Sequence, residues 1–600
     1  MKLSNNLYII IFLFFTISLY ADNYDYKVAT DSGISQGYKK GKVLHWDDIP
    51  YAKPPINNLR WKAPRKIYSP ENIITSKEDN FCVQRPSNLG GPGGEGDFIG
   101  TEDCLYLDIL SPSKRNNDLL PVLFWIHGGG NTSGLKDLYD FRKMVKKHNV
   151  LVVRINYRLG PFGWFTHPAI QDFQSGIDKT SNFGTLDIIA ALNWVQENIS
   201  SFGGNPKNVT IFGESAGGHN VYSLLVSEKA NKLFHKAIAM SGYTTSISTI
   251  DAYKPKKKSS TSNFSSNNIV NKILRDQSQS RNPSEYTSEE VRNILLELSA
   301  EDFFNYYSDR KAYEELPLLT ADGIAIPKMG LRKALAEEKF INKVPLIAGS
   351  NRDEVKLWLA SAEYFVDIDF SPVGSVLGIP KVVLKDEDAF EAFNYYRSSA
   401  WKIRGVDNPL LGLYEAGNKN LYAYRYDWDD HRKYLIADFK KLIGAAHATE
   451  IPILAGNTKL VGGYPLSDLI YPPSFSKSFL SRNMMMFWAN FAKTGLPGKS
   501  TNSIDWIPFI SKQNKRMSYL ILDSKKNLKI DSNSNTFESL SKELFYDTRV
   551  NSLEKCVILL QMFTFVGDDL YDENIKHYPE KCNRFESEKF LIDNASFIEY

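Results

Sequence analysis

The sequence predicts an α/β protein with a large, mostly parallel central sheet that helices cover on both faces. Three observations support this fold class. Apolar runs typical of strands buried on both faces recur along the chain. Segments with helical spacing of apolar residues stand between them, so strands and helices alternate. No internal repeat or long linker divides the 600 residues. Such alternation indicates βαβ units, which place neighbouring strands parallel.

The predicted elements follow one another from Pro121 onward. The run PVLFWIHGGG indicates a buried strand that ends in glycines. Later strands are expected at Val150–Asn156, Asn208–Phe212, Lys236–Met240 and Val344–Ala348, and helices at Thr185–Glu197 and Gly217–Val226.

Two stretches break this rhythm. Residues 251–290 are rich in Ser, Asn and Lys, which predicts a mobile surface excursion. Beyond about Phe545 the chain becomes acidic and aromatic, and its pattern indicates no particular structure.

The charge balance argues against a polyanionic partner. The formal net charge is +3, and basic residues are spread along the chain. The one basic run, Lys254 to Lys258, lies in a Ser- and Asn-rich stretch and is interpreted as a solvated loop. Nucleic acid is therefore not expected as a partner.

The N-terminus resembles an export signal. Lys2 precedes the apolar stretch Leu7–Leu19, and Ala21 offers a small residue for cleavage. About 13 apolar residues fall short of the roughly 20 that span a bilayer. We predict a signal peptide over residues 1–21 and a secreted protein, extracellular or periplasmic, without stable membrane insertion after cleavage. A membrane anchor is the competing interpretation.

Four cysteines suit an exported chain. Pairing neighbours joins Cys82 to Cys104 and Cys556 to Cys582, although spacing alone leaves the other two connectivities open. The cysteines and histidines show no zinc spacing, so neither a metal nor a cofactor is expected.

The main chemical motif is Gly213-Glu214-Ser215-Ala216-Gly217, a G-x-S-x-G sequence. The motif alone is weak, but here it follows a predicted strand and precedes a predicted helix. A sharp turn between these elements needs small neighbours and lifts the Ser215 hydroxyl clear of the sheet at a helix N-terminus. We therefore predict that Ser215 is a nucleophile.

A second glycine-rich motif, HGGG, begins at His127 and ends a predicted strand. Its backbone N–H groups are free to turn towards an oxyanion. Gly129, Gly130 and Ala216 would together supply three donors. A phosphate-binding loop is disfavoured because no Lys-Ser/Thr pair follows.

With these motifs in place, the chain resembles the type-B carboxylesterase/lipase family, which includes cholinesterases. The resemblance runs from about Val28 to Asp523. The motifs that carry it are IPYAKPP (Ile49–Pro55), Arg60, TEDCLYLDI (Thr101–Ile109), HGGG, NYRLGPFGW (Asn156–Trp164), ALNWVQENISSFGGNPKNVTIFGESAGG (Ala191–Gly218), GSNRDE (Gly349–Glu354) and GAAHATEIP (Gly444–Pro452). It implies an α/β-hydrolase fold with inserted loops and helices over the active site. We expect a catalytic domain over 22–545 and an extension of unknown role over 546–600.

The family orders its triad as Ser, acid and His. From the residues alone either Asp353 or Glu354 follows a strand, and the resemblance favours Glu354. Five histidines follow Ser215, and the resemblance assigns the base to His447 rather than to His219, His235, His431 or His577. The predicted reaction is acyl transfer from a small-molecule ester to water. If the base has the pKa of an ordinary histidine, activity should fall with acid around a midpoint near pH 6.5.

The resemblance also implies supporting residues. Glu214 beside the nucleophile and Ser241, expected to support the acid, match family positions. Arg60 and Glu102 match a buried ion pair, and Cys82–Cys104 matches the first disulfide of the family. The chain departs from the family at Ile188 (usually Gln), at Val355 (usually Gly), and in lacking cysteines near 250–280.

Three alternatives remain at this stage: a catalytically silent binding or adhesion module, an interfacial lipase, and a cholinesterase. The first loses the nucleophile or base in its known members, whereas here both are present. Cholinesterases hold choline on an aromatic ring at a position that falls near Gly94. Between Cys82 and Glu102 the only aromatic residue is Phe98. We therefore predict a general carboxylesterase. The alternative is that an aromatic residue from elsewhere, in the region 363–370, supplies the missing ring.

Overall fold

The fold is described from a computed structural model, which covers residues 26–76, 80–87, 91–114, 118–254, 263–308, 316–369, 381–458, 470–510, 516–532, 535–565, 570 and 580–583. The predicted signal peptide, residues 255–258 of the basic run, and His577 lie outside the described residues.

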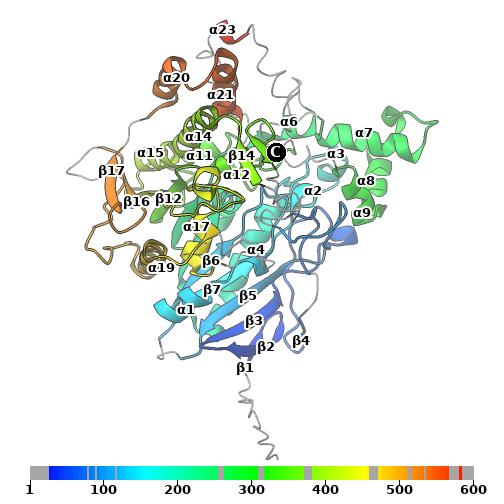
Figure 1. Ribbon diagram of the computed structural model, residues 1–600. Coiled ribbons are helices and arrows are strands. Elements are labelled where there is room, and N and C mark those ends of the chain that lie inside the picture. Colours follow the sequence, from blue (N-terminus) through cyan, green and yellow to red (C-terminus); the bar gives the residue numbers. More distant parts are fainter. Residues whose placement is uncertain are drawn as a thin grey trace, which may run out of the picture.

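One large sheet organises the chain (Figure 1). Its strands, in spatial order, are β1 (Tyr26–Thr30), β2 (Gly33–Lys40), β3 (Val43–Pro50), β5 (Tyr106–Pro112), β7 (Leu151–Ile155), β6 (Leu120–Ile126), β8 (Gly204–Glu214), β9 (Lys236–Met240), β12 (Leu346–Asn351), β15 (Leu421–Tyr426), β16 (Ser518–Leu522) and β17 (Lys529–Ser532), with β4 (Ile73–Ile74) beside β2. From β7 to β16 every neighbouring pair is parallel. The pairs at both ends are antiparallel, apart from β4, which is parallel to β2. The predicted fold class is confirmed.

Helices cover both faces of this sheet and one end of it (Figure 1). Their bounds are α1 (Arg142–His148), α2 (Gly160–Gly163), α3 (Pro168–Gln171), α4 (Phe183–Asn198), α5 (Ala216–Val226), α6 (Thr249–Tyr253), α7 (Ser266–Gln277), α8 (Ser288–Glu297), α9 (Ala300–Asn305), α11 (Leu331–Ala334), α12 (Lys356–Leu359), α14 (Glu387–Lys402), α15 (Asn408–Glu415), α16 (Phe439–Leu442), α17 (Glu450–Ala455), α19 (Phe475–Thr494), α20 (Phe537–Tyr546), α21 (Ser552–Thr564) and α23 (Glu580–Asn583). Two small strand pairs, β10 (Ile247–Ser248) with β11 (Thr320–Ala321) and β13 (Val366–Asp369) with β14 (Lys381–Leu384), lie outside the main sheet. None of the helices traced in the described ranges has both the length and the apolarity needed to cross a membrane.

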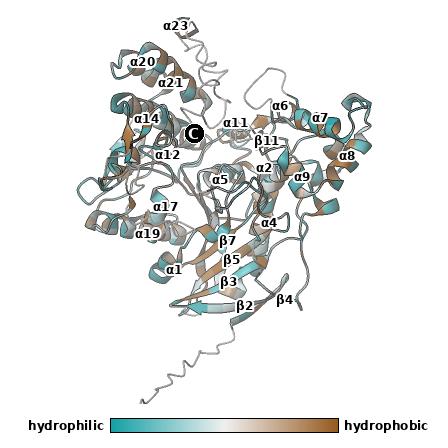
Figure 2. Cartoon of the chain, turned by 45° about the vertical axis from the view of Figure 1, so that its right-hand side comes forward, coloured by the Kyte–Doolittle hydropathy of each residue, from teal (hydrophilic) through white to brown (hydrophobic). Residues whose placement is uncertain are grey.

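The sheet separates two apolar cores. In β6 the side chains of Val122, Phe124 and Ile126 enter one core, and those of Leu123 and Trp125 enter the other. This alternation follows from the two-residue period of a strand, and burial on both faces explains why the run carries no polar residue. Figure 2 shows brown, apolar colouring along β5 and β7, whereas the outlying helices α7 and α8 carry much teal.

The predicted elements occur with shifted ends. β9 has the predicted bounds, and α4 and α5 each extend the prediction by one or two residues. β8 begins four residues earlier than predicted, at Gly204, because its first residues still pair with β6. β12 begins and ends later than predicted, since residues 349–351 continue the pairing with β15.

The prediction of a mobile excursion over 251–290 is wrong for residues 266–277. Residues 266–277 form helix α7, in which Ile269, Ile273 and Leu274 are buried. These side chains pack with Phe303 and neighbouring apolar residues in a separate core cluster. The Ser and Asn content obscured an apolar stripe at helical spacing, which is the stronger signal.

The C-terminal segment packs onto the rest of the fold. Helices α20 and α21 lie against α14, and their side chains Leu544, Val557 and Phe563 share a core cluster with it (Figure 1). A disulfide joins Cys556 in α21 to Cys582 in α23, and a second disulfide joins Cys82 to Cys104.

Candidate active site

Ser215 lies at a tight turn between β8 and α5. Its φ of 57° and ψ of −121° are unusual for a residue with a side chain, and such backbone strain is common at functional positions. The Ser215 amide donates to the Met240 carbonyl at 2.9 Å, and the Ser215 carbonyl accepts from the His219 amide at 2.9 Å. Between Val209 and Ser227, all of them described, only Ser215 is not fully buried. The strand and helix therefore hold one accessible hydroxyl.

The flanking glycines allow this turn to pack tightly. A Cβ atom on Gly217 would collide with the Ile126 carbonyl oxygen, and one on Gly213 would collide with the backbone of Gly217. Since these contacts are with backbone atoms, no side-chain movement relieves them. The small residues of the motif are needed for the approach of α5 to β6.

The amides predicted to bind an oxyanion come from the loop after β6 and from the start of α5. Gly129 has φ of 99° and Gly130 has φ of 64°. Neither amide donates a hydrogen bond to another described residue. Ala216 is the first residue of α5, so its amide has no acceptor within the helix. These three donors have the chemistry required to bind a developing negative charge.

His447 and Glu354 meet although 93 residues separate them in the chain. The imidazole Nδ1 lies 2.6 Å from Oε2 of Glu354. The other carboxylate oxygen, Oε1, accepts from the amide of Asn351 at 2.7 Å. The His447 amide also donates to the Glu354 carbonyl at 3.1 Å. Both side chains are buried, Glu354 completely, so this arrangement fixes the imidazole and directs Nε2 away from the acid.

Asp353, the other acid left open by the residues alone, faces elsewhere. Its Oδ2 accepts from the amide of Ala445 at 2.9 Å and from Arg352 at 2.7 Å, and its Oδ1 accepts from Asn394 at 2.8 Å. Burial acts to raise its pKa, but Arg352 and Lys356 outweigh burial and lower it. Asp353 therefore holds the backbone of the loop that carries His447 rather than its imidazole.

Glu214 lies much closer to the imidazole than its place in the motif suggested. Its Oε1 is 3.2 Å from His447 Nε2, within ion-pair distance, although the angle is not that of a hydrogen bond. Burial raises the pKa of Glu214 well above its usual value. For His447 burial acts to lower the pKa, but the carboxylates of Glu214 and Glu354 outweigh burial and raise it to about 9.

Some residues around the imidazole were missed by the sequence analysis. Glu450 is fully buried, and its Oε2 accepts from the side chain of Asn351 at 2.6 Å. Burial raises the pKa of Glu450 to about 7. The rings of Trp358 and Trp401 lie 5.2 and 4.9 Å from the imidazole centroid. Glu450 belongs to the same segment as His447, GAAHATE (Gly444–Glu450), so its closeness in the sequence was a signal. No pattern in the sequence connects the two tryptophans with His447.

The expected role of Ser241 is not found. The Ser241 hydroxyl makes no hydrogen bond to any described residue, although its amide donates to the Gly349 carbonyl at 2.7 Å. The hydrogen bond that Glu354 Oε1 accepts comes from Asn351 instead. The prediction that Ser241 supports the acid directly is therefore wrong. Ile188 and Val355, which depart from the family pattern, are fully buried in apolar cores.

The other described histidines that follow Ser215 each contact a backbone group through the ring. His219 Nε2 lies 2.8 Å from the Thr245 carbonyl oxygen, and His431 Nε2 lies 2.8 Å from that of Gly444. His235 Nδ1 accepts from the Val209 amide at 3.2 Å. None of these side-chain contacts involves the Ser215 turn, whereas His447 Nε2 lies 3.2 Å from Oε1 of Glu214, the residue before Ser215.

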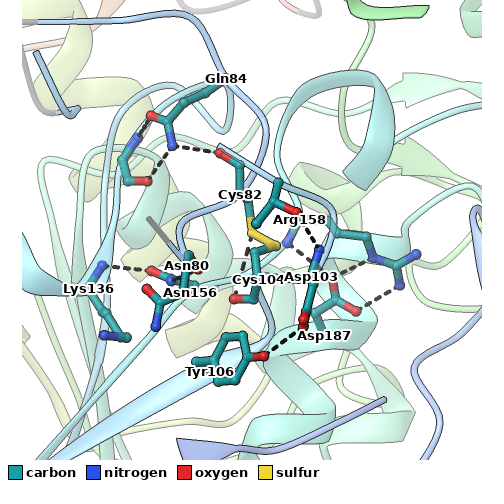
Figure 3. The surroundings of a disulfide bond; sticks show 12 residues. Asn80, Cys82, Gln84, Asp103, Cys104, Tyr106, Lys136, Asn156, Arg158 and Asp187 are labelled. Carbon is teal, nitrogen blue, oxygen red and sulfur yellow. Dashed lines mark hydrogen bonds and ion pairs between the residues drawn. A yellow bond between two sulfur atoms is a disulfide. The ribbon is translucent and has the colours of Figure 1, made fainter. Parts of the chain in front are cut away.

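The disulfide Cys82–Cys104 lies close to Gln84, which contacts the segment after the glycine loop (Figure 3). Gln84, two residues after Cys82, is fully buried and holds Gly134 from both sides: its Nε2 donates to the Gly134 carbonyl at 3.0 Å, and its Oε1 accepts from the Gly134 amide at 2.8 Å. Nε2 also donates to the Cys82 carbonyl at 2.9 Å. The cross-linked loop thus supports the segment that follows Gly129 and Gly130.

Arg60 and Glu102 form a buried bidentate pair beside this loop. Arg60 Nε and Nη2 donate to the two Glu102 oxygens at 2.8 and 2.6 Å. Arg60 Nη1 also donates to the carbonyls of Leu295 and Leu298, at the end of α8. Only 5% of the arginine side chain and 10% of the glutamate side chain are exposed.

We expect a non-additive double-mutant cycle for Arg60→Met and Glu102→Gln. Either single change should cost about 3–5 kcal/mol of unfolding free energy, because the partner remains buried without its counter-charge. The double change should cost less than the sum of the two. Urea unfolding of the four proteins measures the coupling, and additive losses would contradict it.

Comparisons with known proteins show what the chain as a whole is similar to. A family model described as the carboxylesterase family matches residues 25–370 and 406–539. The para-nitrobenzyl esterase of Bacillus subtilis is 30% identical over 525 residues, which cover 86% of this chain and 98% of that protein. A liver carboxylesterase of Sus scrofa is 31% identical over 493 residues, 75% of this chain and 80% of that protein. A solved structure of a PNB esterase aligns with a TM-score of 0.61 and 28% identity, covering 84% of this chain and 97% of that one.

Proposed function

The chain belongs to the carboxylesterase family and has its α/β-hydrolase fold, and from this premise we propose that it hydrolyses small-molecule carboxylic esters through an acyl-enzyme on Ser215. The observation that carries the proposal is the 2.6 Å contact between His447 Nδ1 and Glu354, together with the 3.2 Å approach of His447 Nε2 to Glu214, the residue that precedes the accessible serine on its strained turn. A buried acid that fixes an imidazole next to a hydroxyl is the arrangement that activates a serine nucleophile.

In the proposed first half-reaction His447 Nε2 accepts the Ser215 proton while the serine oxygen attacks the ester carbonyl carbon. The carbonyl oxygen becomes an oxyanion, which the amides of Gly129, Gly130 and Ala216 stabilise. Collapse of this intermediate breaks the bond to the alkoxy oxygen, and that oxygen receives the proton from His447. The alcohol leaves, and the acyl group stays on Ser215.

In the second half-reaction water takes the place of the alcohol. His447 accepts a proton from the water, whose oxygen attacks the acyl carbon, and the same amides bind the second oxyanion. The bond to Ser215 then breaks, and its oxygen recovers the proton. Glu354 keeps the imidazole in one tautomer throughout and stabilises its charged form.

We expect the acid limb of kcat/KM on a neutral ester to lie above the ordinary histidine value of about 6.5. His447 acts as a base only when it is neutral, so activity rises as pH rises through its pKa. Burial acts to lower this pKa, but the carboxylates of Glu214 and Glu354 outweigh burial and raise it, so we expect the midpoint to lie above the value near 6.5 expected from the sequence. A pH–rate profile with p-nitrophenyl acetate measures the limb.

Glu214→Gln provides the control for that profile. The substitution replaces the carboxyl group 3.2 Å from Nε2, which is charged when it pairs with a protonated imidazole, by an amide of similar size. The acid limb should therefore move to lower pH. A wild-type midpoint at 6.5 or below, with no shift in the variant, would show that Glu214 carries no charge in the active range.

We also propose that the protein is exported. Two disulfides are present among the described residues, and disulfides persist mainly in oxidising compartments. The apolar N-terminal stretch supports the same conclusion, because its length and flanks match those of a signal peptide.

We expect no marked preference for acetylthiocholine over its uncharged dimethylbutyl isostere. Gly94 is exposed and has no side chain to stack on an ammonium, and Phe98 packs edge-on against Phe304. Tyr364, from the alternative segment, donates to Glu554 at 2.9 Å. A desolvated cation–π contact is worth about 2 kcal/mol, or roughly thirty-fold in affinity. Measuring kcat/KM for both substrates tests this, and a preference for the charged one above about tenfold would contradict it.

A further inference from the structure

The C-terminal extension reaches the neighbourhood of His447. Helix α21 ends at Thr564, and the next residue, Phe565, caps it with an amide bonded to the Gln561 carbonyl at 3.0 Å. The Phe565 ring packs edge-on against Trp358 at 5.3 Å and lies 5.6 Å from Trp401. Both tryptophan rings are in turn within 5.2 Å of the imidazole of His447.

Two arginines hold Phe565 in this place. Arg404 Nη1 donates to the Phe565 carbonyl at 3.0 Å, which suits a cation at the C-terminus of a helix. The Arg397 guanidinium carbon lies 4.4 Å from the centroid of the Phe565 ring. Arg397 comes from α14, and Arg404 comes from the π-helical turn Ile403–Asp407 that follows it. Phe565 is thus bound through both its backbone and its ring.

The tryptophans differ in how they are held. Trp401 is 3% exposed, and its Nε1 donates to the Gly242 carbonyl at 3.2 Å. Trp358 is only half-buried, on the short helix α12. Phe565 is also half-buried. The Trp358 ring therefore depends on its ring neighbours for its position, and Phe565 is the neighbour contributed by the extension.

The rings of Trp358, Trp401 and Phe565 form an aromatic wall beside His447. Two of the three, Trp401 and Phe565, come from outside the segments that the family model matches. The match omits residues 371–405, which contain Arg397 and Trp401, and ends at residue 539, before Phe565. Two such segments therefore meet beside a histidine that lies within the match. Figure 1 shows the corresponding elements, with α21 lying over α14.

We propose that Phe565 is a positioning residue for ester selectivity: it fixes Trp358 against Trp401 and so narrows the space beside His447 to short ester chains. The proposal rests on the proposed esterase function and adds the substrate class, esters of short acyl or alcohol chains. It also gives the C-terminal extension a role, since α21 and its disulfide to Cys582 carry Phe565 to this wall.

The test compares the full-length protein with Phe565→Ala, Phe565→Leu and Phe565→Tyr. Two substrate pairs are used: p-nitrophenyl acetate and octanoate, which vary the acyl chain, and ethyl and octyl acetate, which vary the alcohol. Phe565→Ala should raise the ratio of kcat/KM for the long ester to kcat/KM for the short ester about tenfold in one of the two substrate pairs. The rise should come from a lower KM for the long ester. Phe565→Leu should raise this ratio less, and Phe565→Tyr, which keeps the ring, should retain the wild-type ratio.

Phe537→Ala is the matched control. Phe537 is another half-buried phenylalanine of the C-terminal helices, but its ring packs on Phe563 at 5.4 Å. Phe537→Ala should lower the thermal midpoint without changing the long-to-short ratio of kcat/KM in either substrate pair. Unchanged ratios in a folded Phe565→Ala variant, or in Phe565→Leu if the alanine variant does not fold, would overturn the proposal. A ratio that also rises in Phe537→Ala would overturn it too, because the effect would then be one of general loosening. A wild-type protein inactive on all four esters would instead overturn the esterase function itself.

Discussion

Replacing Ser215 with alanine should lower kcat on p-nitrophenyl acetate by about 10⁴- to 10⁶-fold, since the members of a catalytic triad act as a unit. The thermal midpoint should change little. Alanine has the same Cβ atom at the strained φ of 57°, so the change removes only a partly exposed hydroxyl. Steady-state rates and a thermal melt of the same preparation separate the loss of chemistry from a loss of fold.

Ser241→Ala is the matched control for this variant. Ser241 also has a positive φ and directly follows β9, the strand beside β8, but its hydroxyl makes no hydrogen bond to a described residue. It should retain nearly the wild-type rate. If Ser215→Ala kept more than a tenth of the activity, Ser215 would not be the nucleophile.

The second large effect is expected at Glu354. Glu354→Gln should lower kcat by about 10⁴-fold, because an amide no longer holds the imidazole in the tautomer that leaves Nε2 free to accept a proton. Asp353→Asn should cost far less activity and act mainly on stability, since Asp353 contacts the backbone of Ala445 and the side chains of Arg352 and Asn394. Rates and unfolding free energies of the two variants make the comparison. Equal losses of activity would show that the two acids share the role.

The fold and the position of the Ser215 turn were predictable because each depends on a local pattern. A strand buried on both faces has a continuous apolar run that the sequence shows directly. The turn at Ser215 requires the glycines around it. Glu354 was separable from Asp353 only through the family resemblance, because the two acids are adjacent. Only the fold shows that one of them turns to His447 and the other to Ala445.

The surroundings of His447 were less predictable, because they are assembled from distant segments. The charge of Glu214 at 3.2 Å from Nε2, the ring of Trp401 and that of Phe565 come from three separate elements. No spacing rule connects them. The pKa of the base, raised to about 9, is likewise a property of buried carboxylates that meet only in the folded chain.

Organophosphate titration tests the central claim most directly. The full-length protein is incubated with a fluorophosphonate, residual activity on p-nitrophenyl acetate is followed, and the labelled peptide is identified by mass spectrometry. An activated serine should be labelled with one equivalent per chain, at Ser215, with complete loss of activity, and Ser215→Ala should take up none. Labelling at another residue, or full activity after prolonged exposure, would contradict the assignment of Ser215 as the nucleophile.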